Sequence, residues 1–329
     1  MEYTKIPGLN VRSSRIGLGT WAIGGWMWGG TDEQKSIDTI HSALDKGINF
    51  IDTAPAYGFG LSEEIVGKAV EQYGNRKDLQ IATKVGIDWD ENGEVFRNAS
   101  RERIFKEVED SLERLRMDYI DVYQVHWPDP LVPIKETAEA MKQLYDEGKI
   151  KAVGVSNFSP QQMDEFREVA PVHTCQPPYN LFEREIEDDV LPYCRENNIV
   201  PLTYGALCRG LLTGKMKPDT HFEGDDLRKM DPKFQPPRYR QYLEAVNKLD
   251  EFAQNYDKIV LHLAVRWILD RIEDGIALWG ARKPQQIDPV NEVMGWKLDH
   301  DALQNIDSIV EETIKDPTGP EFMAPPARE

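Results

Sequence analysis

Four side chains within the first 126 residues form a set that can deliver a proton to an oxygen atom: Asp52, Tyr57, Lys84 and His126. A tyrosine with an ordinary pKa of about 10 donates poorly at neutral pH unless its phenolate is stabilised. A lysine ammonium beside the phenol would stabilise that phenolate, and an aspartate would keep the ammonium charged and oriented. A histidine above the same point would hydrogen-bond a carbonyl oxygen. The set therefore suits a carbonyl whose oxygen gains negative charge as hydride arrives at its carbon.

These four residues stand where short apolar segments end. Asp52, Lys84 and His126 each close such a segment, and Tyr57 follows in the loop of NFIDTAPAYG, where Pro55 forbids a regular helix. Taken singly, each residue has a more common structural role at the end of such a segment. An aspartate is more often a helix cap, a lysine is more often a surface residue, and a histidine is more often a core residue. Four such types at successive segment ends favour a catalytic site.

The segments that must position these four residues alternate along the chain between the apolar spacing typical of strands and that typical of helices. The strand-like segments span residues 15–19, 49–52, 79–84, 120–126, 152–157, 172–176, 199–204 and 275–280. The helix-like segments span residues 33–46, 61–73, 100–116, 135–147, 160–168, 186–197, 241–269 and 284–294. Eight such units, with strands apolar on both faces, predict an α/β fold, a (β/α)8 TIM barrel. Catalytic groups of such barrels gather at the C-terminal ends of the strands. We expect one domain over residues 1–329.

Three further segments do not belong to a minimal barrel. KIPGLNVRSS, residues 5–14, has a turn-like Pro-Gly and predicts a hairpin that plugs the N-terminal end of the barrel. Residues 210–240 and the proline-rich tail 316–329 predict long loops on the C-terminal face, and long ordered loops are often functional. Thr31 and Ser62, each followed by acidic residues, predict two helix N-caps.

Composition excludes several classes of partner. The net charge of −18 and the isoelectric point near 4.9 disfavour nucleic-acid binding, so any phosphate site must be locally basic. No apolar run approaches the roughly 18 residues of a membrane span, and the N-terminus lacks a signal-peptide pattern. Cys175, Cys194 and Cys208 lack zinc-ligand spacing and indicate reduced thiols of the cytoplasm. The loop starting at Asp88 resembles a calcium loop but has Ala99 at its twelfth position, so we expect no metal.

Several motifs resemble those of the aldo-keto reductase superfamily: LGTWAIGG, IDTAPAYGFGLSEEIVGKA, IATK, DVYQVHWPDP, AVGVSNF, QPPYNLFERE, YGALCRGLLTGK and LWGARKP. The resemblance runs from about residue 5 to 315. It is greatest to bacterial NADPH-dependent reductases of the general stress protein 69 type, which implies a stress-response enzyme. It also implies a barrel that binds NADPH or NADP+ without a Rossmann domain, and a catalytic tetrad of Asp52, Tyr57, Lys84 and His126.

The resemblance further implies a set of cofactor contacts along the strand ends, with Asp52 among them. Those near the nicotinamide ribose are Gly19, Thr20 and Trp21. Those that hydrogen-bond the carboxamide are Ser156, Asn157 and Gln176, while Tyr204 stacks on the ring. Those that follow the pyrophosphate are Gly205, Ala206, Leu207, Cys208, Arg209, Gly210 and Lys215. Those at the adenosine end are Gly280, Ala281, Arg282 and Gln286.

Residue chemistry agrees with parts of this implied set. Amide side chains can both donate to and accept from a carboxamide. Arg282, followed by Pro284 at an expected helix start, places a guanidinium beside free N–H groups. One departure concerns adenine: Val290 occupies the position where many family members have an asparagine. Whether Asp288 or Asn291 replaces that asparagine stays open.

The sequence thus predicts an NADPH-dependent reductase that converts aldehydes or ketones to alcohols by hydride transfer, with Tyr57 as general acid and a broad substrate range. Trp21 and Trp127 would join Tyr57 and His126 in the substrate pocket. An alternative is a nucleotide-sensing channel subunit with weak or no turnover, which the complete tetrad disfavours. A metal-dependent barrel hydrolase is disfavoured because the strand ends lack a ligand cluster.

Overall fold

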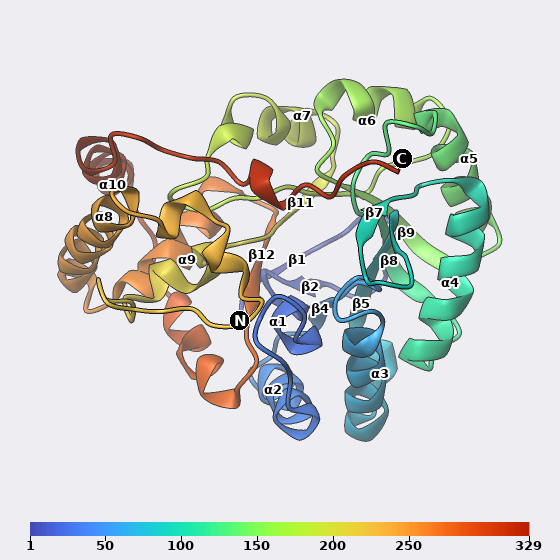
Figure 1. Ribbon diagram of the computed structural model, residues 1–329, viewed down its shortest axis with the longest axis horizontal. Coiled ribbons are helices and arrows are strands. Elements are labelled where there is room, and N and C mark those ends of the chain that lie inside the picture. Colours follow the sequence, from blue (N-terminus) through green and yellow to red (C-terminus); the bar gives the residue numbers. More distant parts are fainter. Residues whose placement is uncertain (329) are drawn as a thin grey trace.

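The computed structural model describes residues 1–328, and its centre is a closed barrel of eight parallel strands (Figure 1). In chain order the strands are β3 (Ile16–Gly19), β4 (Phe50–Asp52), β5 (Gln80–Val85), β8 (Ile120–Val125), β9 (Ile150–Ser156), β10 (Thr174–Gln176), β11 (Val200–Thr203) and β12 (Ile276–Gly280). Each strand pairs in parallel with its neighbours, and β12 closes the barrel on β3. The predicted (β/α)8 TIM barrel is therefore confirmed.

Helices surround the barrel because each has one apolar face to bury against the strands (Figure 1). They are α2 (Glu33–Asp45), α3 (Leu61–Tyr73), α4 (Arg101–Leu115), α5 (Ile134–Asp146), α6 (Pro160–Arg167), α7 (Val190–Glu196), α8 (Arg238–Ala253), α9 (Val260–Arg271) and α10 (His300–Thr313), with the short α1 (Trp21–Gly24) after β3. Within residues 1–328, none of the helices combines the length and the apolar character needed to cross a membrane.

The hairpin at the N-terminal end of the barrel is present as predicted. β1 (Tyr3–Thr4) pairs antiparallel with β2 (Ser13–Ser14), and the connection between them buries Ile6 and Leu9. These two side chains join the barrel interior, a cluster of Phe50, Ala82, Val122, Ala152, Val200, Leu202, Ile276 and Leu278. Because this end is filled with apolar side chains, the opposite end is left for chemistry.

Two predicted helices are wrong. Residues 241–269 form two helices, α8 and α9, because the chain turns through the 3-10 helix η6 (Gln254–Tyr256) and the left-handed Asp257 at φ 56°. Residues 284–294 form the 3-10 helices η7 (Pro284–Gln286) and η8 (Asp288–Val293), and α10 supplies the last helix.

Both predicted N-caps are also wrong. Asp32 caps α2 instead of Thr31, since its carboxylate accepts from the Lys35 amide at 3.1 Å. Ser62 lies inside the first turn of α3, where its hydroxyl donates to the Thr20 hydroxyl at 2.8 Å.

Three additions cover the C-terminal face. A hairpin of β6 (Ile87–Trp89) and β7 (Val95–Arg97) follows β5, and the calcium-like sequence is its turn. Residues 210–240 hold the 3-10 helices η4 (Leu227–Lys229) and η5 (Pro232–Phe234), after η3 (Cys208–Thr213). The tail crosses from α10 to β7 through η9 (Glu321–Met323), seen in dark red in Figure 1. It is anchored where the Arg97 amide donates to the Pro326 carbonyl at 2.9 Å.

Candidate active site

The ends of β4 and β5 bring three of the predicted catalytic residues into direct contact. The Nζ atom of Lys84 lies 2.7 Å from Asp52 Oδ2, 3.0 Å from the Thr53 carbonyl oxygen and 3.1 Å from the Tyr57 hydroxyl. Lys84 and Asp52 are buried. Since the lysine has no exposed surface, its ammonium is oriented by these partners rather than by solvent.

A glutamine that the motifs do not reveal completes the shell around Asp52. Gln124 donates to Asp52 Oδ1 at 3.2 Å, and Gln176 donates to the same oxygen at 2.8 Å. The two amides also contact each other at 3.2 Å. A glutamine two residues before His126, inside a segment that forms a buried strand, is the signal that could have identified Gln124. Asp52 is therefore held by an ammonium on one oxygen and by two amides on the other.

Burial sets the protonation of the other groups. Burial and the Asp52 charge hold the pKa of Tyr57 well above its usual value, so the phenol keeps its proton. Burial and the Lys84 charge hold the pKa of His126 well below its usual value, so the imidazole is neutral. Burial lowers the pKa of Lys84, and Asp52 opposes that shift. Nδ1 of His126 has no partner among residues 1–328, and its ring meets the Tyr57 ring edge-on at 5.8 Å.

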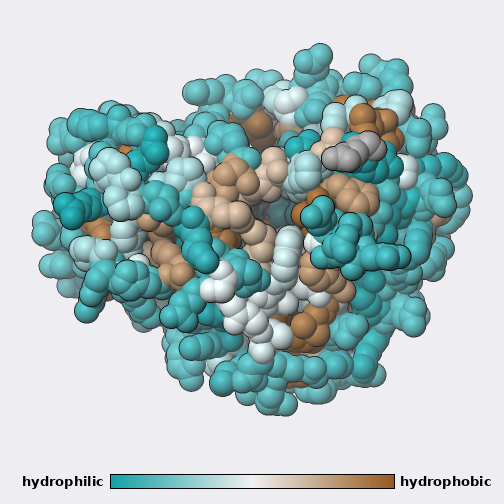
Figure 2. Space-filling model, in the orientation of Figure 1, coloured by the Kyte–Doolittle hydropathy of each residue, from teal (hydrophilic) through white to brown (hydrophobic). Residues whose placement is uncertain are grey.

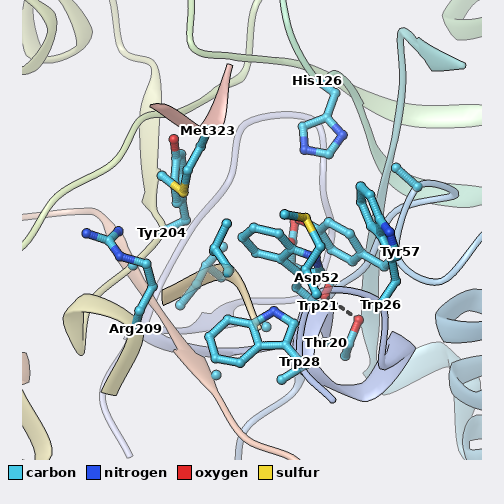
Figure 3. Close-up of a pocket in the computed structure, with 18 of the residues that line it drawn as sticks. Thr20, Trp21, Trp26, Trp28, Asp52, Tyr57, His126, Tyr204, Arg209 and Met323 are labelled. Carbon is cyan, nitrogen blue, oxygen red and sulfur yellow. Dashed lines mark hydrogen bonds between the residues drawn. The ribbon is translucent and has the colours of Figure 1, made fainter. Parts of the chain in front are cut away.

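These groups face a cavity of about 440 Å³ on the C-terminal side of the barrel (Figure 2). Figure 3 shows Asp52, Tyr57 and His126 directed toward it, with Tyr204 and Arg209 across from them. All of the predicted site residues line the cavity except Lys84, Cys208 and Lys215. Lys84 is buried behind Tyr57, Cys208 is buried in η3, and Lys215 is exposed on the surface.

Amides and hydroxyls from β9 to β11 form the polar floor. Asn157, left-handed at φ 60°, donates to the His126 carbonyl at 3.0 Å and accepts from the Tyr204 hydroxyl at 3.0 Å. The Ser156 hydroxyl donates to the Gln176 carbonyl at 2.8 Å. These bonds fix the side chains before any ligand arrives, which reduces the ordering cost of binding.

Cationic side chains gather on the loops that follow β11 and β12. Arg282 Nη1 donates to the Trp28 carbonyl, and the backbone N–H of Arg282 donates to Gln286 Oε1 at 2.9 Å. Arg228 lies with its guanidinium 5.4 Å from the Trp28 ring and pairs with Asp226 at 2.5 Å. Arg228 lines the cavity from residues 210–240, and no sequence signal separates it from neighbouring surface charges. The Asp226 carboxylate offsets the charge of Arg228, so Arg282 is the guanidinium at this end that has no carboxylate partner within residues 1–328.

The Arg209 side chain already forms ion pairs with acidic side chains of the protein. Its guanidinium pairs with Glu183 at 2.5 Å and Asp231 at 2.6 Å, and Lys233 Nζ also pairs with Glu183 at 2.8 Å. Burial alone would raise the pKa of Glu183, but Arg209 and Lys233 lower it to about 2. Lys233 further donates to the Gly319 carbonyl of the tail at 3.1 Å. This buried charge cluster joins the loop after β11 to residues 231–234 and to the tail.

The position expected near adenine is buried in this protein. Val290 is fully buried, while Asn291 is exposed. Asp288 is exposed and pairs with Lys46 at 3.4 Å. Of the two candidates, Asp288 therefore already has a cationic partner.

The remaining wall is apolar. Trp21 stacks on Tyr57 with ring centroids 5.9 Å apart, and Trp28 meets Trp21 edge-on at 5.8 Å. Trp127 also lines the cavity, with the Arg97 guanidinium 5.3 Å from its ring. Beyond the predicted wall, the hairpin contributes Ile87 and Val95, and the tail contributes residues 322–326. These distant segments carry no motif that marks them as pocket residues.

Within residues 1–328, no group of three or more His, Cys, Asp or Glu side chains is placed to hold a metal ion.

Comparisons with known proteins place this geometry in a family. The chain is 64% identical to Aldo-keto reductase YhdN of Bacillus subtilis (strain 168), over all of this chain and 99% of that protein. It is 38% identical to the NADH-specific methylglyoxal reductase of Escherichia coli (strain K12), over 86% and 91% of the two chains. The structure of the glycerol dehydrogenase AKR11B4 from Gluconobacter oxydans matches with a TM-score of 0.90 and 54% identity, over 98% and 99% of the chains. The profile described as Aldo/keto reductase family matches residues 15–311, and the chain belongs to this family of oxidoreductases.

Proposed function

We propose that this protein reduces aldehydes and ketones to alcohols with NADPH, and that Tyr57 is the general acid. The observation that carries the proposal is the 3.1 Å contact between Lys84 Nζ and the Tyr57 hydroxyl beside a cavity that His126 also faces. When bound, the nicotinamide supplies hydride to the carbonyl carbon. The side chains of this protein carry out all of the other steps.

Tyr57 holds and delivers the proton. Its raised pKa keeps the phenol protonated before reaction, and the Lys84 ammonium stabilises the phenolate that donation leaves behind. Neutral His126 is free to donate a hydrogen bond that orients the substrate oxygen toward Tyr57. Asp52 keeps Lys84 in place through the 2.7 Å pair. The apolar walls exclude water, which strengthens these electrostatic interactions.

The cavity suits a dinucleotide phosphate along its length. Ser156, Asn157 and Gln176 offer polar atoms at the nicotinamide end, and Tyr204 offers a ring face. Arg282 supplies positive charge at the far end, where a ribose phosphate would need it, whereas Arg228 beside it is paired with Asp226. The Escherichia coli relative is named as NADH-specific, so cofactor choice in the family varies. Arg282 is our reason for preferring NADPH here.

A nucleotide-sensing protein with little turnover is the second candidate. The set of Asp52, Tyr57, Lys84 and His126 is complete and supports an enzyme. All three cysteines are free and buried, which supports a cytoplasmic location. The test mixes the purified protein with NADPH and follows NADPH absorbance with and without an aldehyde. Aldehyde-dependent oxidation supports the reductase, whereas tight NADPH binding without turnover contradicts it.

A further inference from the structure

A row of three aromatic side chains leads outward from the cavity. Trp26 lines the cavity, its ring lies 5.2 Å from Phe59, and Phe59 lies 5.4 Å from Trp89 of β6. Phe59 is 37% exposed, and Trp26 and Trp89 are half-buried. We propose that this aromatic row is a binding subsite for the far, apolar end of a long aldehyde or ketone. The proposal rests on the proposed function and names a substrate class for it.

The backbone at Phe59 holds its ring outward at an energetic cost. Phe59 has φ 56° and lies between Gly58 at φ 70° and Gly60 at φ 97°. Glycine or asparagine adopts this left-handed region readily, whereas a bulky side chain there is strained. Residues held in such conformations cluster at ligand sites. Phe59 is also two residues after Tyr57, so the loop that carries the proton donor carries this ring as well.

The side chains that the hairpin and the tail contribute to the cavity are all apolar. Ile87 and Val95 line the cavity from the hairpin, and Met323 and Pro325 line it from the tail. The cavity arginines belong instead to residues 209, 228 and 282, and Figure 3 shows Arg209 across the cavity from Trp26 and Tyr57. A charged far end would therefore lose its hydration without gaining a partner on this side.

A cation beside the row, Arg103, is neutralised by its neighbours. The Arg103 guanidinium lies 5.4 Å from the Trp89 ring, but it pairs with Asp88 at 3.0 Å and with the buried Glu107. The row therefore offers apolar area and ring faces. An alkyl chain or an aromatic ring would bury apolar surface there, whereas a carboxylate or a polyol would not.

Such a contact is made equally in the bound substrate and in the transition state. Removing it raises KM and leaves kcat nearly unchanged. It also affects only substrates long enough to reach the row. These two properties separate a substrate subsite from a structural support for the Tyr57 loop, whose loss would lower kcat for every substrate.

The experiment measures kcat and KM with NADPH for straight-chain aldehydes from propanal to dodecanal. In the parent enzyme kcat/KM should rise along the series. Two variants test the row: Phe59→Asn, whose asparagine tolerates the left-handed backbone, and Trp89→Ala. In both, the kcat/KM of the longest aldehyde divided by that of the shortest should fall about tenfold, because KM for the long aldehyde rises. Phe59→Tyr should retain the parent ratio. The matched control is Tyr73→Ala, another exposed aromatic residue (38%) on α3, which should leave the ratio unchanged.

An unchanged ratio in both variants would overturn the subsite. An equal loss of kcat for short and long aldehydes in Phe59→Asn would also overturn it, and would assign Phe59 to supporting the Tyr57 loop. If the parent enzyme reduces none of the aldehydes, the proposed function itself fails, and this outcome is distinct from the other two.

Discussion

At the scale of single residues, the role proposed for Tyr57 requires the site both to hold a proton and to release it. Burial and Asp52 keep the Tyr57 phenol protonated, while Lys84 lies close enough to stabilise the phenolate. The first role needs an isolated phenol, and the second needs an adjacent cation. Placing Asp52 behind Lys84 allows both, because the carboxylate holds the ammonium against the phenol.

We expect Tyr57→Phe to abolish carbonyl reduction while the dissociation constant for NADPH stays near that of the parent. The phenol supplies the proton, and general acid catalysis contributes about 10²–10⁴-fold to rate. The ring remains and still stacks on Trp21. Steady-state turnover and a fluorescence titration with NADPH measure the two quantities. Turnover within tenfold of the parent would show that another group supplies the proton.

Lys84→Met should lower kcat severely and move the alkaline limb of the pH–rate profile upward. The reduction requires protonated Tyr57, so activity is lost as pH rises through the pKa of that phenol. Without the neighbouring ammonium the phenolate is less stable, and this pKa rises further. A pH series of kcat in the parent and the variant tests the shift. A lowered rate with an unchanged profile would mean that Lys84 only positions its neighbours.

At the scale of elements, the buried charge cluster of Glu183, Arg209, Asp231 and Lys233 joins three segments that the chain keeps far apart. Lys233 alone contacts both Glu183 and the tail carbonyl of Gly319. Breaking a buried pair is costly because it leaves a carboxylate with less compensation, although replacing a whole pair is often neutral.

Lys233→Met should therefore lower the free energy of unfolding by about 3 kcal/mol or more, the range for breaking buried ion pairs. The matched control is Lys142→Met, which breaks an exposed pair with Asp146 on α5 and should cost at most about 0.5 kcal/mol. Urea unfolding of both variants measures the difference. Equal losses would show that the cluster does not anchor the tail.

Elements with strong periodicity could be predicted, and those set by turn chemistry could not. All eight barrel strands follow from apolar segments of the sequence, whereas the plug that buries Ile6 and Leu9 is predicted from the Pro-Gly turn in residues 5–14. The break between α8 and α9 depends on one left-handed residue, Asp257, which no periodicity reveals. The β6–β7 hairpin has few apolar residues, and its turn is held by Asp90, whose carboxylate accepts from the Asn92 and Glu94 amides at 2.9 Å.

The candidate site likewise has residues that could be predicted from the sequence and residues that could not. Residues at strand ends are placed by the barrel itself, so Asp52, Tyr57, His126 and Asn157 could be predicted to share one cavity. Arg228 and the tail residues 322–326 reach the cavity through long loops, whose paths depend on tertiary contacts such as the bond between Arg97 and the Pro326 carbonyl.

At the scale of the whole molecule, a net charge of −18 opposes the approach of an anionic cofactor. At physiological ionic strength the Debye length is about 8 Å, so salt screens most of this repulsion and only close contacts decide affinity. Arg282 and Arg228 are the cations that line the far end of the cavity, next to Trp28. NADPH differs from NADH by one ribose phosphate, so these close contacts should separate the two cofactors.

We expect Arg282→Ala to weaken NADPH binding by about 10–100-fold and to leave NADH binding within a few-fold. A charge-assisted hydrogen bond to phosphate contributes roughly 1.5–3 kcal/mol, which corresponds to that range. Fluorescence titration with each cofactor measures both dissociation constants, and Lys283→Ala, at the exposed neighbouring position, is the control. Arg282 also donates to the Trp28 carbonyl and so supports the loop that covers the cavity. Equal losses for NADPH and NADH would assign Arg282 to that supporting role, because a loop that loosens affects both cofactors alike, whereas a lost phosphate contact affects only one.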